Sequence, residues 1–198
     1  MTFVVASNNQ NKVEEISRML KPLGLYVKTA AELGTSLDDV EESGETFKEN
    51  AEIKAKAACE KTGLPAIADD SGLVVDALGG RPGVYSARYA GENASDEDRI
   101  NKLLSELCNS GSSDRTAHFE CVMCCYFPNG EKIFSFGSCD GTIGYAPRGT
   151  DGFGYDPIFF TDNNKTFAEL TDIQKDAVSH RGRAIRDLVE QLGKKFNH

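Results

Sequence analysis

The chain has 198 residues, of which 39% are hydrophobic, and a formal net charge of −9. This length suits one large domain or two small lobes with a substantial core, and the composition excludes a disordered chain. The acidic balance argues against a broad nucleic-acid surface, where basic side chains must offset phosphates. It is compatible with a small phosphate ligand in a local basic pocket, where a divalent cation can add positive charge.

The hydrophobic pattern and the turn signals predict alternating strands and helices. In the first part of the chain these are a strand over residues 2–7, a helix over 12–24, a strand over 25–30, a helix over 46–63 and a strand over 65–69 that residues 73–78 can continue. In the second part they are a helix over 95–109, two strands over 116–127 and 132–144 around a Pro-Asn-Gly turn, a glycine-rich loop over 147–160 and a closing helix after the Ser-His-Arg-Gly segment at 179–182. Without internal repeats or linkers, this order predicts one α/β domain over residues 1–198 with a mixed sheet.

Targeting signals are absent from the sequence pattern. No apolar run approaches the roughly 20 residues that a membrane span needs. The first residues, MTFVVASNNQNK, lack the basic start and the long apolar stretch of a secretion signal. We therefore expect no membrane partner, a cytosolic location and reduced thiols.

Three of the six cysteines crowd into the segment FECVMCCYF, residues 119–127. A zinc site would need paired CxxC spacings or neighbouring histidines, but the chain has one CxxC and only three histidines. We interpret the segment as a buried strand in which cysteine acts as a small hydrophobic residue.

The first loop, ASNNQNK, lies between a predicted strand and a predicted helix. Such a loop leaves backbone N–H groups at the helix N-terminus free to bind an anion. Ser7 and Asn9 add side-chain donors and Lys12 adds a positive charge. The alternative is plain helix capping by Asn or Ser.

The predicted helix over 46–63 has a capping signal, with Thr46 at its start, Glu49 three residues later and Gly63 as its stop. Its Lys54 shares a face with Asn50, four residues earlier. The acidic loop before this helix contains Glu42. Such a loop is usually solvated surface, but its carboxylates gain a purpose beside a metal, because Mg²⁺ prefers oxygen ligands.

Asp69 and Asp70 follow a predicted strand, so we expect them at a sheet edge facing a cleft. The side chains of neighbouring residues on an extended chain point to opposite sides, so the two acids cannot have the same role. One acid would bind a metal or activate water, while the other would fix the loop through backbone hydrogen bonds. The alternative is an Asx-type turn before Ser-Gly.

Two later segments carry further candidates. The glycine-rich loop would let the backbone approach a flat ligand, with Phe153 or Tyr155 stacked on a base. The segment KDAVSHRG brings together Lys175, His180 and Arg181. An arginine at a helix start is unfavourable toward the helix dipole, which indicates a ligand contact. Exposed charges on a helix are the alternative reading.

Six segments occur in the order ASNNQNKVEE, FKENAEIKA, ADDSGLVVDALGGRPGVYSARYAG, PRGTDGFGYDPIF, FAEL and SHRGRAI. Together they closely resemble the inosine triphosphate pyrophosphatase family, especially its bacterial-type members, from about Phe3 to the final helix. Where many members read Thr-Gly-Asn in the first loop, this chain reads Ser-Asn-Asn. Ser7 keeps the hydroxyl, and Asn8 is tolerated in a left-handed conformation.

The resemblance implies an elongated mixed β-sheet flanked by helices, with two lobes and an active-site cleft between them. It implies hydrolysis of ITP, dITP and XTP to the monophosphate and pyrophosphate, which keeps these nucleotides out of DNA and RNA. It also implies Mg²⁺ as cofactor and a homodimer. Two alternatives are a nucleotide-binding sensor with weak catalysis and a pyrophosphatase for other modified nucleotides.

The resemblance also implies roles by position. Asp70 would be the catalytic base, Glu42 and Asp70 the metal ligands, and Lys54 and Ser71 substrate contacts. The remaining substrate contacts form two groups, a triphosphate grip of Ser7, Asn8, Asn9, Gln10, Asn11 and Lys12, and a nucleobase pocket of Phe153, Gly154, Tyr155, Asp156, Lys175, His180 and Arg181.

Overall fold

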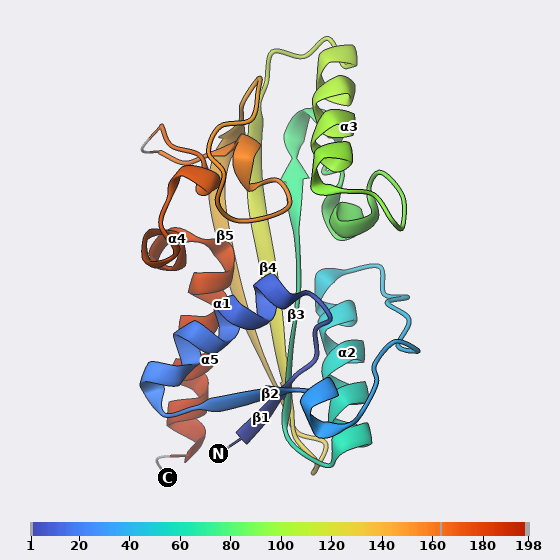
Figure 1. Cartoon of the computed structure of the whole chain (residues 1–198), viewed down its shortest axis with the longest axis vertical. Helices are drawn as coiled ribbons and strands as arrows, with labels where there is room; N and C mark the ends of the chain where they lie inside the picture. Colours follow the sequence, from blue (N-terminus) through green and yellow to red (C-terminus); the bar gives the residue numbers. More distant parts are fainter. Residues whose placement is uncertain (1, 163, 197–198) are drawn as a thin grey trace. The chain divides into compact units, whose positions relative to one another are not determined.

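The computed structural model describes residues 2–162 and 164–196. It contains one six-stranded sheet with the order β2-β1-β3-β4-β5-β6 (Figure 1). The strands are β1 Thr2–Val5, β2 Tyr26–Thr29, β3 Ala66–Val75, β4 Thr116–Tyr126, β5 Lys132–Ile143 and β6 Phe159–Phe160. The α-helices are α1 Gln10–Leu20, α2 Phe47–Thr62, α3 Asp96–Asn109, α4 Asp172–Val178 and α5 His180–Phe196.

The sheet is mixed, as the sequence predicts. Strand β1 runs parallel to both β2 and β3, whereas β5 and β6 are antiparallel. The chain divides into two compact units, and β3, β4 and β5 each contribute residues to both. The first unit comprises residues up to Asp70, Cys121–Gly137 and residues from His180 onward; the second comprises Ser71–Glu120 and Ser138–Ser179.

Local signals fix the helix that precedes β3. The Thr46 side chain accepts from the Glu49 N–H, and the Glu49 carboxylate accepts from the Thr46 N–H, which completes the predicted capping box. At the other end Gly63 takes φ 69°, a left-handed conformation that glycine adopts without strain. The predicted start and stop of α2 are therefore confirmed.

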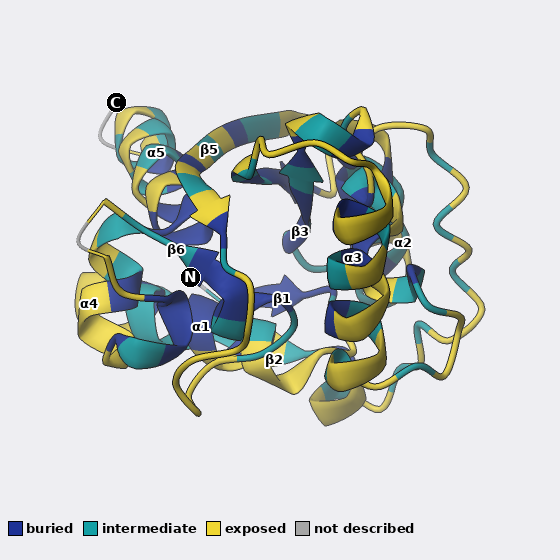
Figure 2. Ribbon diagram, turned by 90° about the horizontal axis from the view of Figure 1, so that it is seen from above, coloured by how far each residue is buried: buried dark blue, intermediate teal, exposed yellow. Residues whose placement is uncertain are grey.

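Two hydrophobic clusters build the core of the first unit, one on each face of its strands. Phe3 and Val5 of β1 pack with residues of α1 and α5, while Val4 between them packs with alanines of α2. This alternation follows from the two-residue period of a strand. It buries β1 almost completely, so that the strand is dark blue in Figure 2.

The cysteine-rich segment lies in β4, and its three thiols are fully buried in these clusters. Cys121 and Cys125 face the side of α1 and α5, and Cys124 faces α2. The interpretation of these cysteines as core residues is confirmed.

The second unit has its own core, to which α3 contributes its apolar face. Phe119 packs in it against two other rings, with its ring 4.7 Å from that of Phe159 and 5.7 Å from that of Phe167, measured between centroids. The helix begins after a capping box formed by Ser95 and Asp98, and its outer face is exposed (Figure 2).

The placement of Asp69 and Asp70 at a strand end was wrong. Both lie inside β3, which continues without interruption to Val75. The Ser71-Gly72 pair looks like a break in the local sequence, but pairing with the neighbouring strands keeps it extended. The Asx-turn alternative is wrong for the same reason.

In the first unit, helix α5 covers the outer edge of β5. Strand β6 pairs with β5 only at Thr142 and Ile143, in the second unit. Near the start of β5, Gln191 donates to the Phe134 carbonyl at 2.8 Å, and Asp187 accepts from the Phe136 N–H at 3.2 Å. These side chains occupy backbone groups that a further strand would otherwise use. None of the helices in the described residues has the length and apolar character to cross a membrane.

Candidate active site

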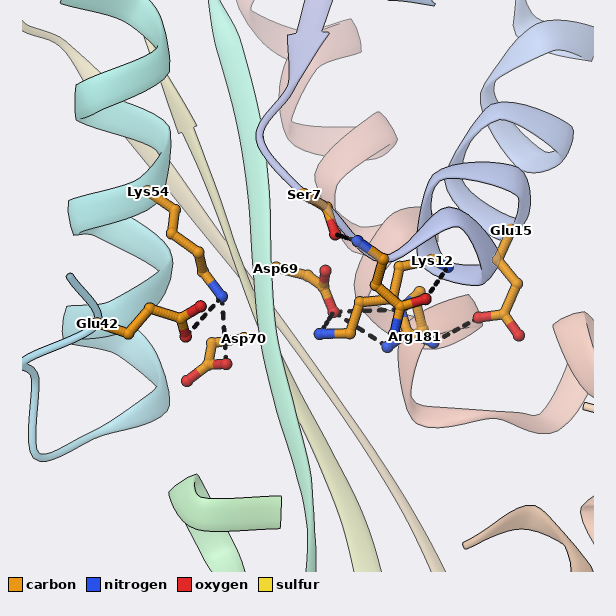
Figure 3. Close-up of polar contacts among 9 residues, drawn as sticks. Ser7, Lys12, Glu15, Glu42, Lys54, Asp69, Asp70 and Arg181 are labelled. Atoms are coloured by element: carbon orange, nitrogen blue, oxygen red, sulfur yellow. Dashed lines mark hydrogen bonds and ion pairs between the residues drawn. The ribbon is translucent and has the colours of Figure 1, made fainter. Parts of the chain in front are cut away.

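Asp69 and Asp70 are adjacent in β3, and their side chains point to opposite faces of the strand. Figure 3 shows Asp69 turned toward α1 and α5, and Asp70 turned toward α2 and the loop that carries Glu42. The sequence argument that neighbouring residues on an extended segment point in opposite directions is confirmed.

Asp69 is enclosed by two cations. Its Oδ2 lies 3.1 Å from Lys12 Nζ and accepts from Arg181 Nε at 3.2 Å and Nη2 at 3.1 Å. Burial by itself would raise the pKa of Asp69, but the charges of Lys12, Arg181 and Lys54 outweigh burial and hold that pKa well below its usual range. The ionised form of Asp69 is therefore favoured, and its carboxylate orders Lys12 and Arg181.

Arg181 connects three elements of the first unit. It lies in the first turn of α5, donates to Asp69 of β3 and pairs with Glu15 of α1. Only 2% of the residue is exposed, so the reading of Arg181 as an exposed surface charge is wrong. The two carboxylates compensate a cation that the helix dipole would disfavour. Its contact with a nucleobase stays a prediction.

On the other face, Lys54 joins two carboxylates. Its Nζ donates to Glu42 Oε2 at 3.1 Å and to Asp70 Oδ1 at 3.3 Å. The second oxygen of Asp70, Oδ2, is buried without a hydrogen-bond partner among the described residues. Burial raises the pKa of Asp70, with Lys54 and Lys12 opposing it and Glu42 and Asp69 adding to it. The two neighbouring acids thus have pKa values shifted in opposite directions.

The donors around Lys54 fit a hard divalent cation. The carboxylates of Glu42 and Asp70 both contact the Lys54 ammonium group, and Asp70 Oδ2 has no hydrogen-bond partner among the described residues, so that it is free to coordinate an ion. Within the described part of the chain, no group of three or more His, Cys, Asp or Glu side chains is arranged to hold a metal. The described residues therefore offer two carboxylates at this place, and water and substrate would complete an octahedral ion.

The first loop combines helix capping with exposed donors. The Asn9 side chain accepts from the Lys12 N–H at 3.3 Å, and the Ser7 hydroxyl accepts from the Asn9 N–H at 3.2 Å. The capping interpretation is therefore confirmed for Asn9, while anion binding stays a prediction. Asn8, Gln10 and Asn11 are exposed.

Asn8 has its own contact, a hydrogen bond from Nδ2 to Asp38 Oδ1 of 3.2 Å. Among the described non-glycine residues, Asn164 alone has a positive φ. Asn8 therefore does not use the left-handed conformation that the sequence analysis allowed for it.

His180 begins α5 and is 4% exposed. Its backbone lies against Gly137 of β5. A Cβ at position 137 would stand 2.1 Å from the His180 carbonyl oxygen and 2.6 Å from the Ala184 nitrogen. Only glycine allows this approach, so Gly137 sets the position of the first turn of α5. The sequence analysis missed this residue.

The other predicted nucleobase contacts lie in the second unit. Asp156 Oδ2 accepts from Lys175 Nζ at 2.6 Å and from the Phe153 N–H at 2.9 Å. Lys175 Nζ also lies 4.6 Å from the centroid of the Phe153 ring. This group therefore combines a half-buried aromatic face with a buried ion pair.

Tyr155 and Gly154 have structural partners in the same unit. The Tyr155 ring belongs to the hydrophobic core, and its hydroxyl donates to the Ser86 carbonyl at 3.0 Å. Gly154 donates its N–H to Asp96 Oδ2 at 2.7 Å. Of the two aromatic candidates for base stacking, Phe153 is the more exposed. Ser71, the first residue of this unit, is half-buried.

Glu15 is a second residue that the sequence analysis missed. It is buried, and it pairs with Arg181. A signal was available, because Glu15 and Lys12 are three residues apart on one helix and therefore share a face. The partner of Glu15 could not be found locally, since Arg181 lies 166 residues away.

The first loop caps α1 and is followed by Lys12. Asp69 and Asp70 face opposite sides of β3, and Lys54 is shared by two carboxylates. These features are typical of an enzyme that acts on phosphates. Residues 3–191 match the Ham1 family, and the chain belongs to this family. It is 51% identical over 192 residues to a dITP/XTP pyrophosphatase of Geobacter sulfurreducens, with 96% of each chain covered. It is 47% identical to a Bacillus subtilis protein of the same name, again with 96% of each covered.

Solved structures agree with this assignment. A HAM1 protein from Coxiella burnetii superimposes with a TM-score of 0.89 at 44% identity, covering 98% of this chain and 99% of that one. The Ham1 protein of Staphylococcus aureus gives 0.86 at 44% identity, covering 98% and 100%.

Proposed function

We propose that this protein hydrolyses dITP, XTP and ITP to the nucleoside monophosphate and pyrophosphate. The relatives named dITP/XTP pyrophosphatase, matched over nearly the whole chain, support this reaction. The observation that carries it is the arrangement of Glu42, Lys54 and Asp70. It brings together two carboxylates suited to a divalent cation, a lysine, and a carboxylate oxygen without a hydrogen-bond partner among the described residues.

The phosphates would be bound by the first loop and two lysines. Backbone N–H groups at the start of α1 suit an anion, and exposed Asn8, Gln10 and Asn11 add donors. Lys12 and Lys54 offset charge on the departing pyrophosphate. Because Asp69 already fixes the ammonium group of Lys12, this charge is in place before substrate binds.

Glu42 and Asp70 would hold a Mg²⁺ ion, which supplies charge neutralisation on the phosphates and acidifies water when it is bound. Asp70 takes the proton of the attacking water on its carboxylate, whose Oδ2 has no hydrogen-bond partner among the described residues. Lys54 holds the other oxygen of Asp70, which orients the carboxylate for this transfer. Its position inside β3 gives the base a rigid support.

The base would be selected by its 6-oxo group. A donor facing this oxygen, from Lys175, His180, Arg181 or a backbone N–H, accepts hypoxanthine and xanthine. Adenine presents an amine there, so two donors oppose each other, and polar sites reject such mismatches strongly. Phe153 provides the aromatic face for stacking. Guanine shares the 6-oxo group and must be excluded at its position 2.

The same proposal includes a homodimer, as the family resemblance implies, and the cytosolic location expected from the sequence. Light scattering of the purified protein tests the dimer directly, with a mass of twice 21.5 kDa expected.

Pyrophosphate release from a panel of dITP, XTP, ITP, dGTP, dATP and dUTP, with and without Mg²⁺, tests the reaction. We expect fast release from the first three nucleotides with Mg²⁺ and slow release from the others. Binding without turnover would instead identify a nucleotide sensor. Preference for dUTP or another modified nucleotide would identify a pyrophosphatase of different specificity.

A further inference from the structure

Asn50 connects α2 with the loop that carries Glu42. Its Oδ1 accepts from the Gly44 N–H at 2.8 Å, and Gly44 lies two residues after Glu42 in the chain. Asn50 also lies one helical turn before Lys54 and therefore on the same face of α2. A single amide thus anchors the loop beside the lysine that holds Glu42.

The contact between Asn50 and Gly44 is tight on both sides. Asn50 is fully buried, and a Cβ at position 44 would lie 2.7 Å from Asn50 Oδ1 and 2.7 Å from Glu49 Cβ. A side chain at position 44 would therefore push the loop away from α2. The loop keeps its place only with a glycine on one side and a short acceptor on the other.

Asn50 is not the best residue for packing. Its Nδ2 is buried and has no hydrogen-bond partner among the residues described, and an unmet buried donor lowers stability. An apolar side chain of similar shape, such as leucine, would remove that penalty. The amide is therefore better explained by what its oxygen holds than by the core around it.

We propose that Asn50 is a positioning residue that fixes the Glu42 loop in place for the divalent cation through its hydrogen bond to the Gly44 N–H. This rests on the proposed pyrophosphatase function and adds a determinant of its metal dependence. Asn50 itself contacts neither the metal nor the substrate. It decides whether Glu42 is in position before they bind.

The variant Asn50→Leu separates positioning from stability. Residues 38–46 should exchange their amide hydrogens faster in the metal-free and nucleotide-free protein, as measured by mass spectrometry. The Mg²⁺ concentration for half-maximal pyrophosphate release should rise about 10-fold, as for other residues that orient metal ligands. The melting temperature should change little, because removal of the unmet Nδ2 donor offsets loss of the hydrogen bond from the Gly44 N–H.

Gly44→Ala tests the same contact from the loop side and leaves α2 intact. It should reproduce the faster exchange of residues 38–46 and the higher Mg²⁺ concentration needed for half-maximal pyrophosphate release. Asn50→Asp keeps an acceptor for the Gly44 N–H, so residues 38–46 should exchange as slowly in this variant as in the wild type. Its added charge alters the metal site, so it is assessed by exchange alone.

Ser135→Ala is the matched control, since Ser135 is also fully buried in the first unit with an unpartnered Oγ among the described residues. It should change neither loop exchange nor Mg²⁺ dependence. If Asn50→Leu and Gly44→Ala keep wild-type exchange and Mg²⁺ dependence while the wild type releases pyrophosphate, the positioning role is wrong and the enzyme function stands. A wild type that releases no pyrophosphate rejects the proposed function, and the exchange data still decide whether Asn50 fixes the loop.

Discussion

Asp69 and Asp70 are neighbours in β3, yet Asp69 Oδ2 lies 3.1 Å from Lys12 Nζ on one face and Asp70 Oδ1 lies 3.3 Å from Lys54 Nζ on the other. Asp69 and Asp70 are therefore two aspartates in adjacent positions with different surroundings. One carboxylate is kept ionised by two cations, and the other is buried with an open oxygen. The two acids should respond differently to the same substitution.

Asp70→Asn should lower kcat by about 10²–10⁴-fold, since it removes the proposed base. Its melting temperature should not fall. Burial raises the pKa of Asp70, and a raised carboxyl pKa means that the ionised form costs stability at neutral pH, above the pKa of the unfolded chain. Steady-state pyrophosphate release and calorimetry check both parts. Near-normal turnover would remove Asp70 from its assigned role.

Asp69→Asn should have the reverse effects, with a large loss of stability and a smaller loss of kcat. Removing the charge leaves Lys12 and Arg181 without their shared buried anion, which should lower the free energy of unfolding by about 3–5 kcal/mol. The loss of kcat should be smaller than for Asp70→Asn. Urea unfolding measures the first effect. Unchanged stability would show that the buried ion pairs contribute little.

Arg181→Lys should destabilise the first unit even though the charge is kept. Lysine cannot reproduce the two guanidinium contacts to Asp69 together with the contact to Glu15. We expect a loss of about 2 kcal/mol in unfolding free energy. Arg183→Lys is the control, because this exposed arginine lies two residues further along α5. Equal effects of the two substitutions would contradict a special role for Arg181.

Lys175→Met should weaken base selection. The substitution removes the ammonium group next to Phe153 and leaves Asp156 without its ion pair. The ratio of kcat/KM for dITP over dATP should fall by on the order of 10-fold, while inhibition by pyrophosphate is unchanged. His118→Gln, a change in β4 outside both predicted substrate groups, should leave the ratio intact. Equal weakening of every triphosphate and of pyrophosphate would place Lys175 among the phosphate contacts.

The substrate-free protein should bind Mg²⁺ weakly. Only Glu42 and Asp70 are proposed as protein ligands, and the described residues contain no cluster of three metal-binding side chains. Glu42→Gln should therefore raise the Mg²⁺ concentration needed for half-maximal rate without unfolding the protein. Titration calorimetry without nucleotide provides the independent measurement. A tight stoichiometric site there would require further protein ligands.

One thiol should react in the native protein. Cys108 is exposed, whereas the other five cysteines are buried. Burial raises the pKa of Cys124 to about 12, with smaller contributions from nearby charges, so almost no thiolate exists there at pH 8. Ellman's reagent should therefore titrate one thiol in buffer and six in denaturant. Fast reaction of several thiols in buffer would contradict the buried packing of β4.

The sequence predicted best those structural features that depend on a few neighbouring residues. The capping box and the final glycine of α2 lie within the helix and its flanks, so both ends were predicted correctly. The opposite directions of Asp69 and Asp70 follow from strand geometry alone. Their position inside β3 was missed, because the pairing that keeps Ser71 and Gly72 extended comes from other strands.

The sequence named candidate site residues one by one, but it did not give their partners in the structure. The spacing of Asn50 and Lys54 indicated a shared face, whereas the contact of Asn50 with Gly44 depends on how the acidic loop folds back. The Arg181–Glu15 pair depends on α5 returning to α1 across most of the chain. Gly137 gave no local signal, since its requirement arises from the backbone of His180.

The contacts of Gln191 and Asp187 with β5 have a consequence for behaviour at high concentration. An open strand edge recruits the edges of other molecules, which is a common first step in aggregation. Here the side chains of α5 occupy the Phe134 carbonyl and the Phe136 N–H. Folded molecules therefore have no free template at this place, and fraying of the last turns of α5 would expose one. The C-terminal helix thus also hinders edge-to-edge strand pairing at this part of β5, which would otherwise favour aggregation in a crowded solution.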